Sequence, residues 1–274
     1  MKAIHLAAFV TLAGLGLLLT AGPARAGQTT VYPPVRIEIP AKADTPAKTA
    51  PPAKADAPAK TQTEEKNPFE KEEEVAPPLA DPVHGMNRAF FSFNDAAYFW
   101  VVKPVARGYK ALLSEGTRVG VSNMFSNLGS PMRVGACLAA GDLKGSGTEL
   151  ARLGVNTTVG LLGYHDSAKS WLKIEMRDTD FGLTFAQWGM GPGWYLNWPL
   201  LGPSCGRDTL ALPLNMVLNP LTFLPGAGII QKINYTSLHI GEYEDLKRNA
   251  LDPYVAIRDA YNQHRRYELK KLER

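Results

Sequence analysis

One short run has the residue types and spacing of a nucleophilic enzyme. The run 202–206 fits the pattern G-x-S-x-G with Ser204 at its centre, and Asp245 and His264 follow in the order that α/β hydrolases use. The pattern needs a strand before the serine and a helix after it, whereas Pro199 and Pro203 crowd the approach. The sequence also has no HGGG-like oxyanion segment. A lipase or esterase with Ser204 as nucleophile is therefore an alternative function.

Neither metal nor nucleotide chemistry is indicated. The five histidines show no ligand spacing, and two cysteines, Cys137 and Cys205, are too few for a Cys-rich zinc site. The Gly-rich run 141–147 lacks the G-K-[ST] ending of a phosphate loop. We therefore predict no cofactor and no metal. Cys137 and Cys205 could form a disulfide in an oxidising compartment.

The composition narrows the choice of function. Of the 274 residues 20% are charged, below the roughly 25% of soluble domains. The net charge of +4 comes from 30 basic and 26 acidic residues, a surplus too small to indicate a nucleic-acid partner. The surplus lies after residue 246, in a stretch that could approach anionic lipid headgroups, an acidic partner or only solvent.

The first 80 residues do not have the pattern of a folded domain. Residues 1–26 combine a basic start, an uncharged apolar run and the small-x-small site Ala24-Arg25-Ala26, which predicts a signal peptide and export. Residues 27–80 repeat Pro-Ala-Lys every six residues and continue into an acidic patch, a composition that cannot bury a core. We predict a disordered, semi-stiff spacer there and a folded domain over 81–274.

The stretch 181–231 departs most from a soluble fold. Its only charged residues are the adjacent Arg207 and Asp208, while six prolines interrupt any helix long enough to cross a bilayer. Backbone broken in this way tolerates membrane depth only where it is buried in protein or lines a cavity. We predict short helices and turns at or within a bilayer, around a cavity; a Pro-rich soluble core is the alternative. Rings of the kind enriched at membrane interfaces stand at Trp188, Trp194, Tyr195 and Trp198.

The rest of the domain has helical patterns. Asp81-Pro82 and Asp252-Pro253 each put a capping carboxylate before a proline, which predicts helix starts. After Asp252, apolar and aromatic residues recur at three- and four-residue steps, the pattern of an amphipathic helix. Long alternating strands are missing, so the expected fold class is mainly α. Further helices are expected over 83–102, ended by Pro104, and over 120–140, 147–155 and 236–249.

A series of short motifs runs in order along the folded domain. Its residues are Asp81-Pro82, Asn87-Arg88, Phe93-Asn94, Val121-Ser122-Asn123, Asn127-Leu128, Pro131, Asn156-Thr157-Thr158, Gly160, Gly163, Asp180-Phe181-Gly182, Trp188-Gly189, Gly193, Tyr195, Pro199, Leu201-Gly202-Pro203-Ser204, Arg207-Asp208 and Asp252-Pro253-Tyr254. Each motif is weak, but the ordered series is specific and covers nearly all of 81–267. It resembles the MlaA (VacJ) family of outer-membrane lipid-transport lipoproteins.

The resemblance implies a ring-like bundle of short, Pro/Gly-interrupted helices in the inner leaflet of the outer membrane, with a central amphipathic channel. Family members remove phospholipids mislocalised in the outer leaflet and pass them to a periplasmic carrier (MlaC-like), often while docked on trimeric porins. They have no known catalytic site. Carried over by motif, Phe93 and Asn94 lie on the helix whose integrity controls channel opening. The 181–208 region contributes to the ring and its lining, through Trp188, Trp194, Tyr195, Arg207 and Asp208.

The single charge pair of the uncharged stretch has two interpretations. Arg207 contacts the phosphate of a passing lipid, because a guanidinium matches phosphate geometry. Alternatively, Asp208 or another acid neutralises Arg207 as a structural pair, and this is the interpretation that we favour.

The signal region departs from the family pattern. Family members usually carry a lipidated cysteine directly after the signal peptide, but Pro23 stands at that position and no cysteine precedes Cys137. We therefore expect the ring domain to hold itself in the membrane without a lipid anchor. A porin-bound scaffold without lipid passage is a further alternative.

Overall fold

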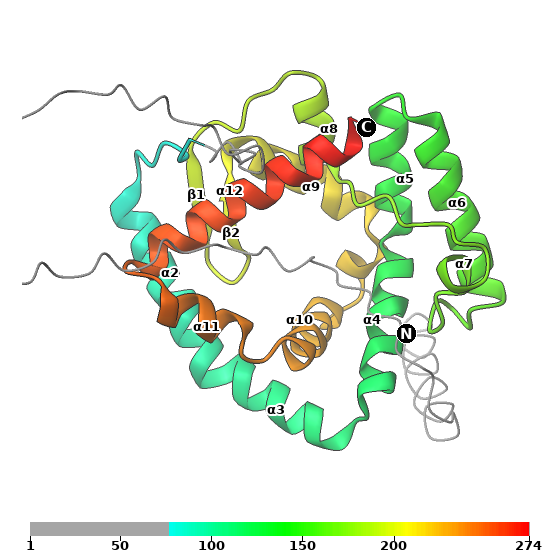
Figure 1. The fold of residues 1–274 in the computed structure, drawn as a ribbon, viewed down its shortest axis with the longest axis horizontal. Helices are drawn as coiled ribbons and strands as arrows, with labels where there is room; N and C mark the ends of the chain where they lie inside the picture. Colours follow the sequence, from blue (N-terminus) through cyan, green and yellow to red (C-terminus); the bar gives the residue numbers. More distant parts are fainter. Residues whose placement is uncertain (1–76, 274) are drawn as a thin grey trace, which may run out of the picture.

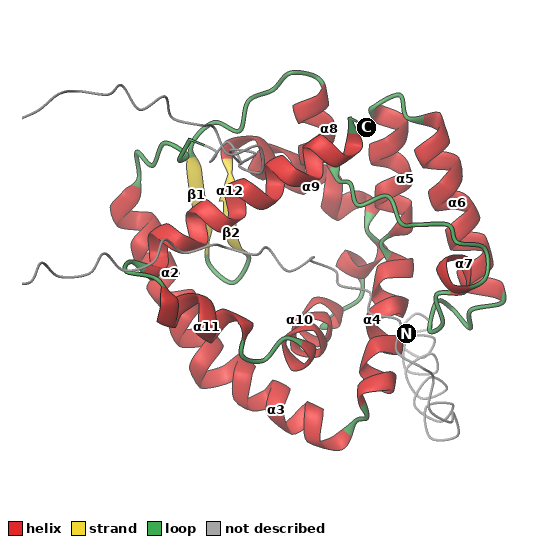
Figure 2. Cartoon of the chain, in the orientation of Figure 1, coloured by secondary structure: helices red, strands yellow, loops and turns green. Residues whose placement is uncertain are grey.

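The computed structural model describes residues 77–273, which form mainly helices joined by short turns (Figures 1 and 2). The signal peptide and most of the spacer predicted over 1–80 lie outside the described residues. Within 77–273, the strands belong to a single two-stranded hairpin. The elements are α2 (His84–Ala97), η1 (Tyr98–Val102), α3 (Lys103–Leu112), α4 (Glu115–Leu128), α5 (Ser130–Ala139), α6 (Leu143–Thr158), α7 (Ser167–Ser170), α8 (Phe181–Gln187), β1 (Tyr195–Trp198), β2 (Gly202–Cys205), α9 (Gly206–Leu218), η2 (Pro220–Phe223), α10 (Ala227–Leu238), α11 (Glu242–Asn249) and α12 (Pro253–Leu272).

The elements close into a ring (Figure 1). The helix α2, the π-helical turn η1 and α3 form one continuous rod, and α3 packs against α10, which contacts α4. From α4 the ring continues through α5, α8 and α9 to β2, and β1 returns to α2. Helix α6 covers the outer side of α5, and α12 packs on α8 and β2. The mainly α, ring-like fold class is therefore confirmed.

Three of the predicted helices have other ends in the structure. Pro104 does not end the first helix, because the wider π-helical turn η1 comes just before it and α3 continues the rod with the proline in its first turn. The helix predicted over 120–140 is divided at Gly129, and Pro131 stands in the first turn of α5. The helix predicted over 236–249 is likewise two helices, α10 and α11.

The two predicted capping aspartates have different roles. Asp252 caps α12, since its Oδ1 accepts from Tyr254 N at 2.9 Å and from Val255 N at 3.4 Å. Asp81 caps no helix, which corrects the prediction for the start of the domain. Its carboxylate accepts from Asn87 Nδ2 at 2.8 Å and from Tyr254 Oη at 2.5 Å. Asp81 thus ties the chain before α2 to both α2 and α12.

The interior of the ring protein is rich in polar side chains. Among the described residues, buried polar and charged residues outnumber buried hydrophobic ones. The buried hydrophobic clusters are small, one around Tyr195 and Tyr254 and one around Phe181 and Ala136. Large apolar side chains are exposed instead, Leu112 at 84%. This polarity is the reverse of the usual pattern, in which Leu, Ile, Val and Phe are buried and charged residues are exposed.

Candidate functional site

The hairpin of β1 and β2 is attached to α2 by a buried asparagine. The two strands pair antiparallel, with Tyr195 opposite Cys205. Asn87 Nδ2 donates to Tyr195 O at 3.0 Å, and Asn87 Oδ1 accepts from Asn197 N at 2.9 Å. In a two-stranded sheet the outer edge of β1 has no neighbouring strand to bond to, and the side-chain amide of Asn87 takes that place. Asn87 is fully buried, so its own amide group also needs these partners.

Asn94, one of the predicted gating residues, holds the turn of the same hairpin. Its Nδ2 donates to Trp198 O at 2.9 Å, and its Oδ1 accepts from Leu200 N at 2.7 Å. Leu200 has a φ of 64°, a left-handed conformation that a leucine keeps only when its surroundings hold it. Lys232 of α10 donates to Leu200 O at 2.5 Å, so the turn is fixed to both α2 and α10. Phe93, the other predicted gating residue, is 51% exposed.

Arg207 and Asp208 belong to a charged cluster that joins α8, α9 and α12. Arg207 Nε donates to Asp208 Oδ1 at 2.9 Å, so the predicted pair forms. Asp208 Oδ2 accepts from Tyr261 Oη at 2.5 Å and lies 2.7 Å from Arg265 Nε, whose N–H is not aligned for a hydrogen bond. Both terminal nitrogens of Arg265 donate to Asp180 at 2.9 Å. The pair is therefore one component of a larger network centred on Asp208 and Arg265.

The pKa values in this cluster follow from the contacts. Burial would raise the pKa of Asp208, but Arg265, the Tyr261 hydroxyl and Arg207 outweigh it and hold the pKa of this carboxyl below its usual range. Burial and the charge of Asp208 raise the pKa of Tyr261, which therefore stays a donor. Gly182 permits the close approach of α8, since a Cβ there would lie 2.4 Å from Asp208 Oδ1.

The predicted aromatic residues divide between surface and core. Trp188 and Trp194 are exposed at 61% and 55%, as contact with a membrane interface requires. Tyr195 is fully buried, with its ring edge-on to Tyr254 and Tyr261 at centroid distances of 5.9 and 6.4 Å. The alternation along β1 turns Tyr195 inward. It is a core residue, which corrects the expectation that its ring lies at an interface or along a channel.

Exposed apolar side chains gather on α9, η2 and the start of α10. The helices of this segment are short, as predicted for 181–231: Pro220 begins η2, whereas Pro213 lies inside α9 without ending it. Exposed apolar residues in this number indicate contact with hydrocarbon or with a partner. Within 77–273, no helix has both the length and the hydropathy needed to cross a bilayer. The side chains, here called the apolar surface, are Leu210, Leu214, Met216, Val217, Leu218, Phe223, Leu224, Ile229 and Ile230.

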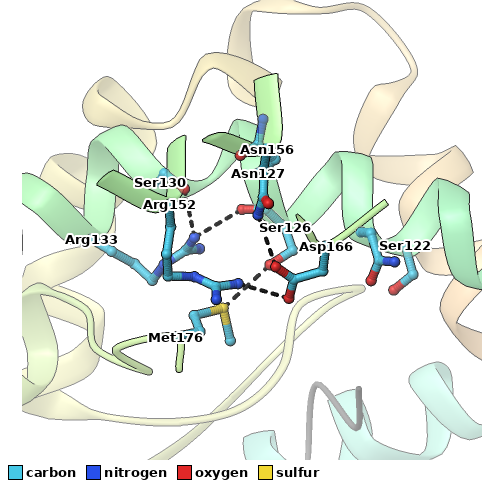
Figure 3. Close-up of a pocket in the computed structure, with 10 residues that line it drawn as sticks. Ser122, Ser126, Asn127, Ser130, Arg133, Arg152, Asn156, Asp166 and Met176 are labelled. Carbon is cyan, nitrogen blue, oxygen red and sulfur yellow. Dashed lines mark hydrogen bonds and ion pairs between the residues drawn. The ribbon is translucent and has the colours of Figure 1, made fainter. Parts of the chain in front are cut away.

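Between α4, α5 and α6, in contrast, charged side chains are buried. Buried Arg133 Nε lies 2.7 Å from Glu149 Oε2, and buried Arg152 Nη2 lies 2.8 Å from Asp166 Oδ2. These four residues are here called the paired-charge core. Three of them, Arg133, Arg152 and Asp166, line a cavity of about 20 Å³, and Figure 3 shows them turned toward it. This volume suits a group the size of water and is far too small for an acyl chain. The paired-charge core therefore holds helices together and passes no lipid.

The three residues of the hydrolase alternative are not brought together. A strand and a helix do flank Ser204, contrary to expectation, but Ser204 lies within β2 and its Oγ is 3.2 Å from Thr209 Oγ1. Asp245 is exposed on α11, and His264 Nε2 lies 3.0 Å from Glu268 Oε1. Within 77–273 the partners of Ser204 Oγ are Cys205 O and Thr209 Oγ1, neither of which is a general base, so this geometry does not support a serine hydrolase.

The two cysteines do not form the disulfide that the sequence left open. Cys137 and Cys205 are both buried and free. Burial raises the pKa of Cys137 to about 11, so this thiol stays protonated and unreactive at neutral pH.

Sequence patterns missed the residues that hold the site together. Asn87 and Asn197 meet across 110 positions, and Asp180 and Arg265 across 85. The helical period places Tyr261 on the inner face of α12 but does not indicate its carboxylate partner. The family motifs include Asn87 and Asp180, and that is the one signal in the sequence that marks them.

The fold and the site define a class of protein: a ring of short helices with paired polar groups inside and apolar side chains exposed. The profile of the MlaA lipoprotein family matches residues 79–268. The chain therefore belongs to the MlaA lipoprotein family.

Individual relatives agree with this assignment. An uncharacterized protein of Rickettsia felis is 32% identical over 194 residues, which cover 68% of this chain and 76% of the relative. The intermembrane phospholipid transport system lipoprotein MlaA of Escherichia coli (strain K12) is 29% identical over 193 residues, which cover 67% of this chain and 76% of the relative. A solved structure described as "Structural basis for maintenance of bacterial outer membrane lipid asymmetry" matches with a TM-score of 0.60 and 27% identity, and covers 69% of this chain and 99% of that one.

Proposed function

We propose that this protein is the outer-membrane component of an intermembrane phospholipid transport system. It maintains outer-membrane lipid asymmetry by removing mislocalised outer-leaflet phospholipids and passing them to a periplasmic carrier. The observation that carries the proposal is the polarity of the ring in an MlaA-family chain: the buried side chains are largely polar and paired, while the apolar surface is exposed.

Moving a phospholipid between membranes requires that its acyl chains be shielded from water. A 16-carbon acyl chain in water costs on the order of 12 kcal/mol, at about 0.8 kcal/mol per methylene. A passage for phospholipid therefore needs apolar walls for the tails and polar groups for the headgroup. In this proposal the apolar surface lies in the hydrocarbon of the inner leaflet, and the ring surrounds an amphipathic channel that crosses the membrane without a spanning helix.

The turn of the hairpin supports a gating role for the helix that carries Phe93 and Asn94. Asn94 from α2 and Lys232 from α10 hold the left-handed Leu200 from two sides. A rearrangement of α2 would release one of these contacts, and the hairpin would then move relative to the rest of the ring. Trp188 and Trp194, both exposed, are placed at the membrane interface in this proposal.

The partners and the cellular location complete the proposal. Residues 1–26 direct export, the 27–80 spacer gives reach in the periplasm, and the ring domain sits on the periplasmic side of the outer membrane. A periplasmic lipid carrier of the MlaC type receives the phospholipid, and a trimeric porin supports the ring in the bilayer. No nucleotide is hydrolysed by this chain, so transport is passive or is driven by these partners.

The proposal is tested by deleting the gene and measuring phospholipid exposed at the cell surface. We expect the deletion strain to accumulate outer-leaflet phospholipid, and the wild-type chain to restore the normal level. Unchanged surface phospholipid in the deletion strain would contradict lipid transport and would favour a scaffold on a porin. Phospholipid that copurifies with the wild-type chain separates these two functions independently.

A further inference from the structure

A second cavity lies beside the charged cluster, between the loop that follows α8, the strand β2 and the helix α12. Its volume is about 370 Å³, within the range of small-molecule sites. Leu79, Met190 and Leu269 are among the apolar residues that line it. This cleft, unlike the cavity of the paired-charge core, is large enough for a portion of a lipid.

Arg207 lines the cleft with most of its bonding capacity unused. It is 7% exposed, and its Nε donates to Asp208 Oδ1. Among the described residues no other group accepts from its side chain, so its two terminal nitrogens have no acceptor within 77–273. These nitrogens are not among the fully enclosed unpartnered atoms of the described residues, so they are open to the cleft and to an anion within it. Their planar fork matches the paired oxygens of a phosphate or carboxylate.

Although Arg265 is shared with Asp180 and Glu268, Asp208 has partners besides the Nε of Arg207. Its Oδ2 already accepts from Tyr261 Oη at 2.5 Å and lies 2.7 Å from Arg265 Nε. The pair between Arg207 and Asp208 therefore orients the arginine, with its Nε toward the cluster. The pair uses only the Nε of Arg207, which leaves its two terminal nitrogens for a ligand in the cleft.

The other charged residues of the cleft favour an anion. Arg265, Arg266 and Lys270 also line it, and Glu273 is the one carboxylate among its lining residues in the described region of the chain. Arg266 and Lys270 are exposed and stand four residues apart, hence on one face of α12. A cationic side of the cleft thus lies next to apolar walls, which is the chemistry of an amphipathic anion.

We propose that this cleft is a headgroup site in which Arg207 binds the phosphodiester of a phospholipid, while Arg266 and Lys270 attract it and Met190 and Leu269 contact its glycerol and upper acyl carbons. The proposal rests on phospholipid transport as the function of the chain. It adds a site on the α12 side of the ring at which a phospholipid binds during transport. A fatty-acid carboxylate shares this chemistry and is distinguished by the test.

The test is calorimetric titration of the purified full-length chain with dihexanoyl phosphatidylglycerol, octanoate and glycerol 3-phosphate. We expect the phospholipid to bind and Arg207→Gln to weaken binding about tenfold or more, as the loss of a charge-assisted contact predicts. Arg248→Gln, which removes an exposed arginine of α11, should bind like the wild type. Equal binding by Arg207→Gln overturns the proposal, as does tighter binding of octanoate or glycerol 3-phosphate than of the phospholipid.

A second variant keeps the test valid if Arg207→Gln fails to fold. Met190→Glu adds a carboxylate to the exposed wall of the cleft and should weaken phospholipid binding, whereas Met86→Glu, at a similarly exposed position on α2, should not. Equal effects of the two substitutions contradict the proposal. Surface phospholipid in the deletion strain is a separate readout: a normal level there refutes the transport function, whereas retained binding by these variants refutes only the headgroup site.

Discussion

The paired-charge core and the apolar surface belong to one ring but differ in what they bury: the first buries charged side chains, and the second exposes apolar ones. Glu149 is fully buried among arginines, while Val217 is 65% exposed among other apolar side chains. In water the first arrangement costs desolvation and the second costs apolar hydration. In hydrocarbon the second becomes favourable, and helices associate through polar bonds and close packing. The contrast is the one expected if the apolar surface lies in hydrocarbon, as proposed above.

The largest effect is expected where one member of the paired-charge core is removed. Arg133→Met leaves the buried Glu149 carboxylate with Arg152 Nε at 4.0 Å and Arg177 N at 2.7 Å. The free energy of unfolding should fall by about 3 to 5 kcal/mol. Chemical denaturation in detergent measures it.

Two controls accompany this experiment. The double variant Arg133→Met, Glu149→Leu removes both charges and should recover most of the lost stability. Arg248→Met breaks an exposed pair with Asp245 and should change the free energy of unfolding by less than about 1 kcal/mol. A loss in the double variant as large as in the single one would mean that packing, and not charge burial, dominates the core.

The second largest effect is expected where a charge is placed in the apolar surface. Val217→Arg places a charge in the apolar surface and should destabilise the membrane-bound protein by about 2.5 to 3.5 kcal/mol. The same substitution on a surface in water is usually within about 0.5 kcal/mol. Membrane partition and unfolding in liposomes measure it. Leu251→Arg, at a fully exposed position between α11 and α12, is the matched control, and equal behaviour of the two variants argues against immersion.

A smaller and more local effect is expected at the hairpin. Asn94→Ala removes the hydrogen bonds to Trp198 O and Leu200 N and should cost about 1 to 2 kcal/mol. Amide exchange over 195–205 should become faster, while exchange in α5 and α6 stays unchanged. Ser92→Ala, which removes a bond to the carbonyl of Arg88 within α2, should leave the hairpin amides as they are. Unchanged hairpin exchange in Asn94→Ala would contradict the role of Asn94 in holding the turn of the hairpin.

The smallest effect is the pH dependence of stability that the carboxyl group of Asp178 contributes. Burial and the charge of Glu268 raise the pKa of Asp178 to about 6. The native state therefore binds more protons than the unfolded one between about pH 4 and pH 6, so this group lowers stability as pH rises through that window. Asp178→Asn should gain on the order of 1 kcal/mol above pH 6 and nothing below pH 4. Denaturation at both pH values checks this, and a gain that is equal at both contradicts it.

The sequence predicts those features of the fold that depend on local chemistry. Asp252 caps α12 because its partners lie two and three residues away. The helices of 181–231 are short, as the prolines predict, although Pro213 lies inside α9 and does not end it. The hairpin is not predicted, because strands of four residues are too short to show alternation. The prediction at Pro104 is wrong because no local pattern indicates the π-helical turn before it, whose Tyr98 Oη donates to Glu244 Oε2 on the distant α11.

The candidate site is only partly predictable for a related reason. Arg207 and Asp208 are conspicuous as the one charge pair in an uncharged stretch, and the pair forms. Their other partners, Tyr261 and Arg265, come from α12, more than 50 residues further along the chain. Periodicity indicates that α12 has an inner face but not which element it covers, and no local pattern indicates that β1 turns Tyr195 inward.

The most direct test of the account is the environment of a spin label at Val217 in liposomes, with Cys137 and Cys205 replaced by serine and a label at Leu251 as reference. The account predicts that the label at Val217 is accessible to oxygen and protected from a water-soluble nickel chelate, while the label at Leu251 shows the reverse. Equal access of the chelate to both labels would contradict the claim that the apolar surface lies in hydrocarbon.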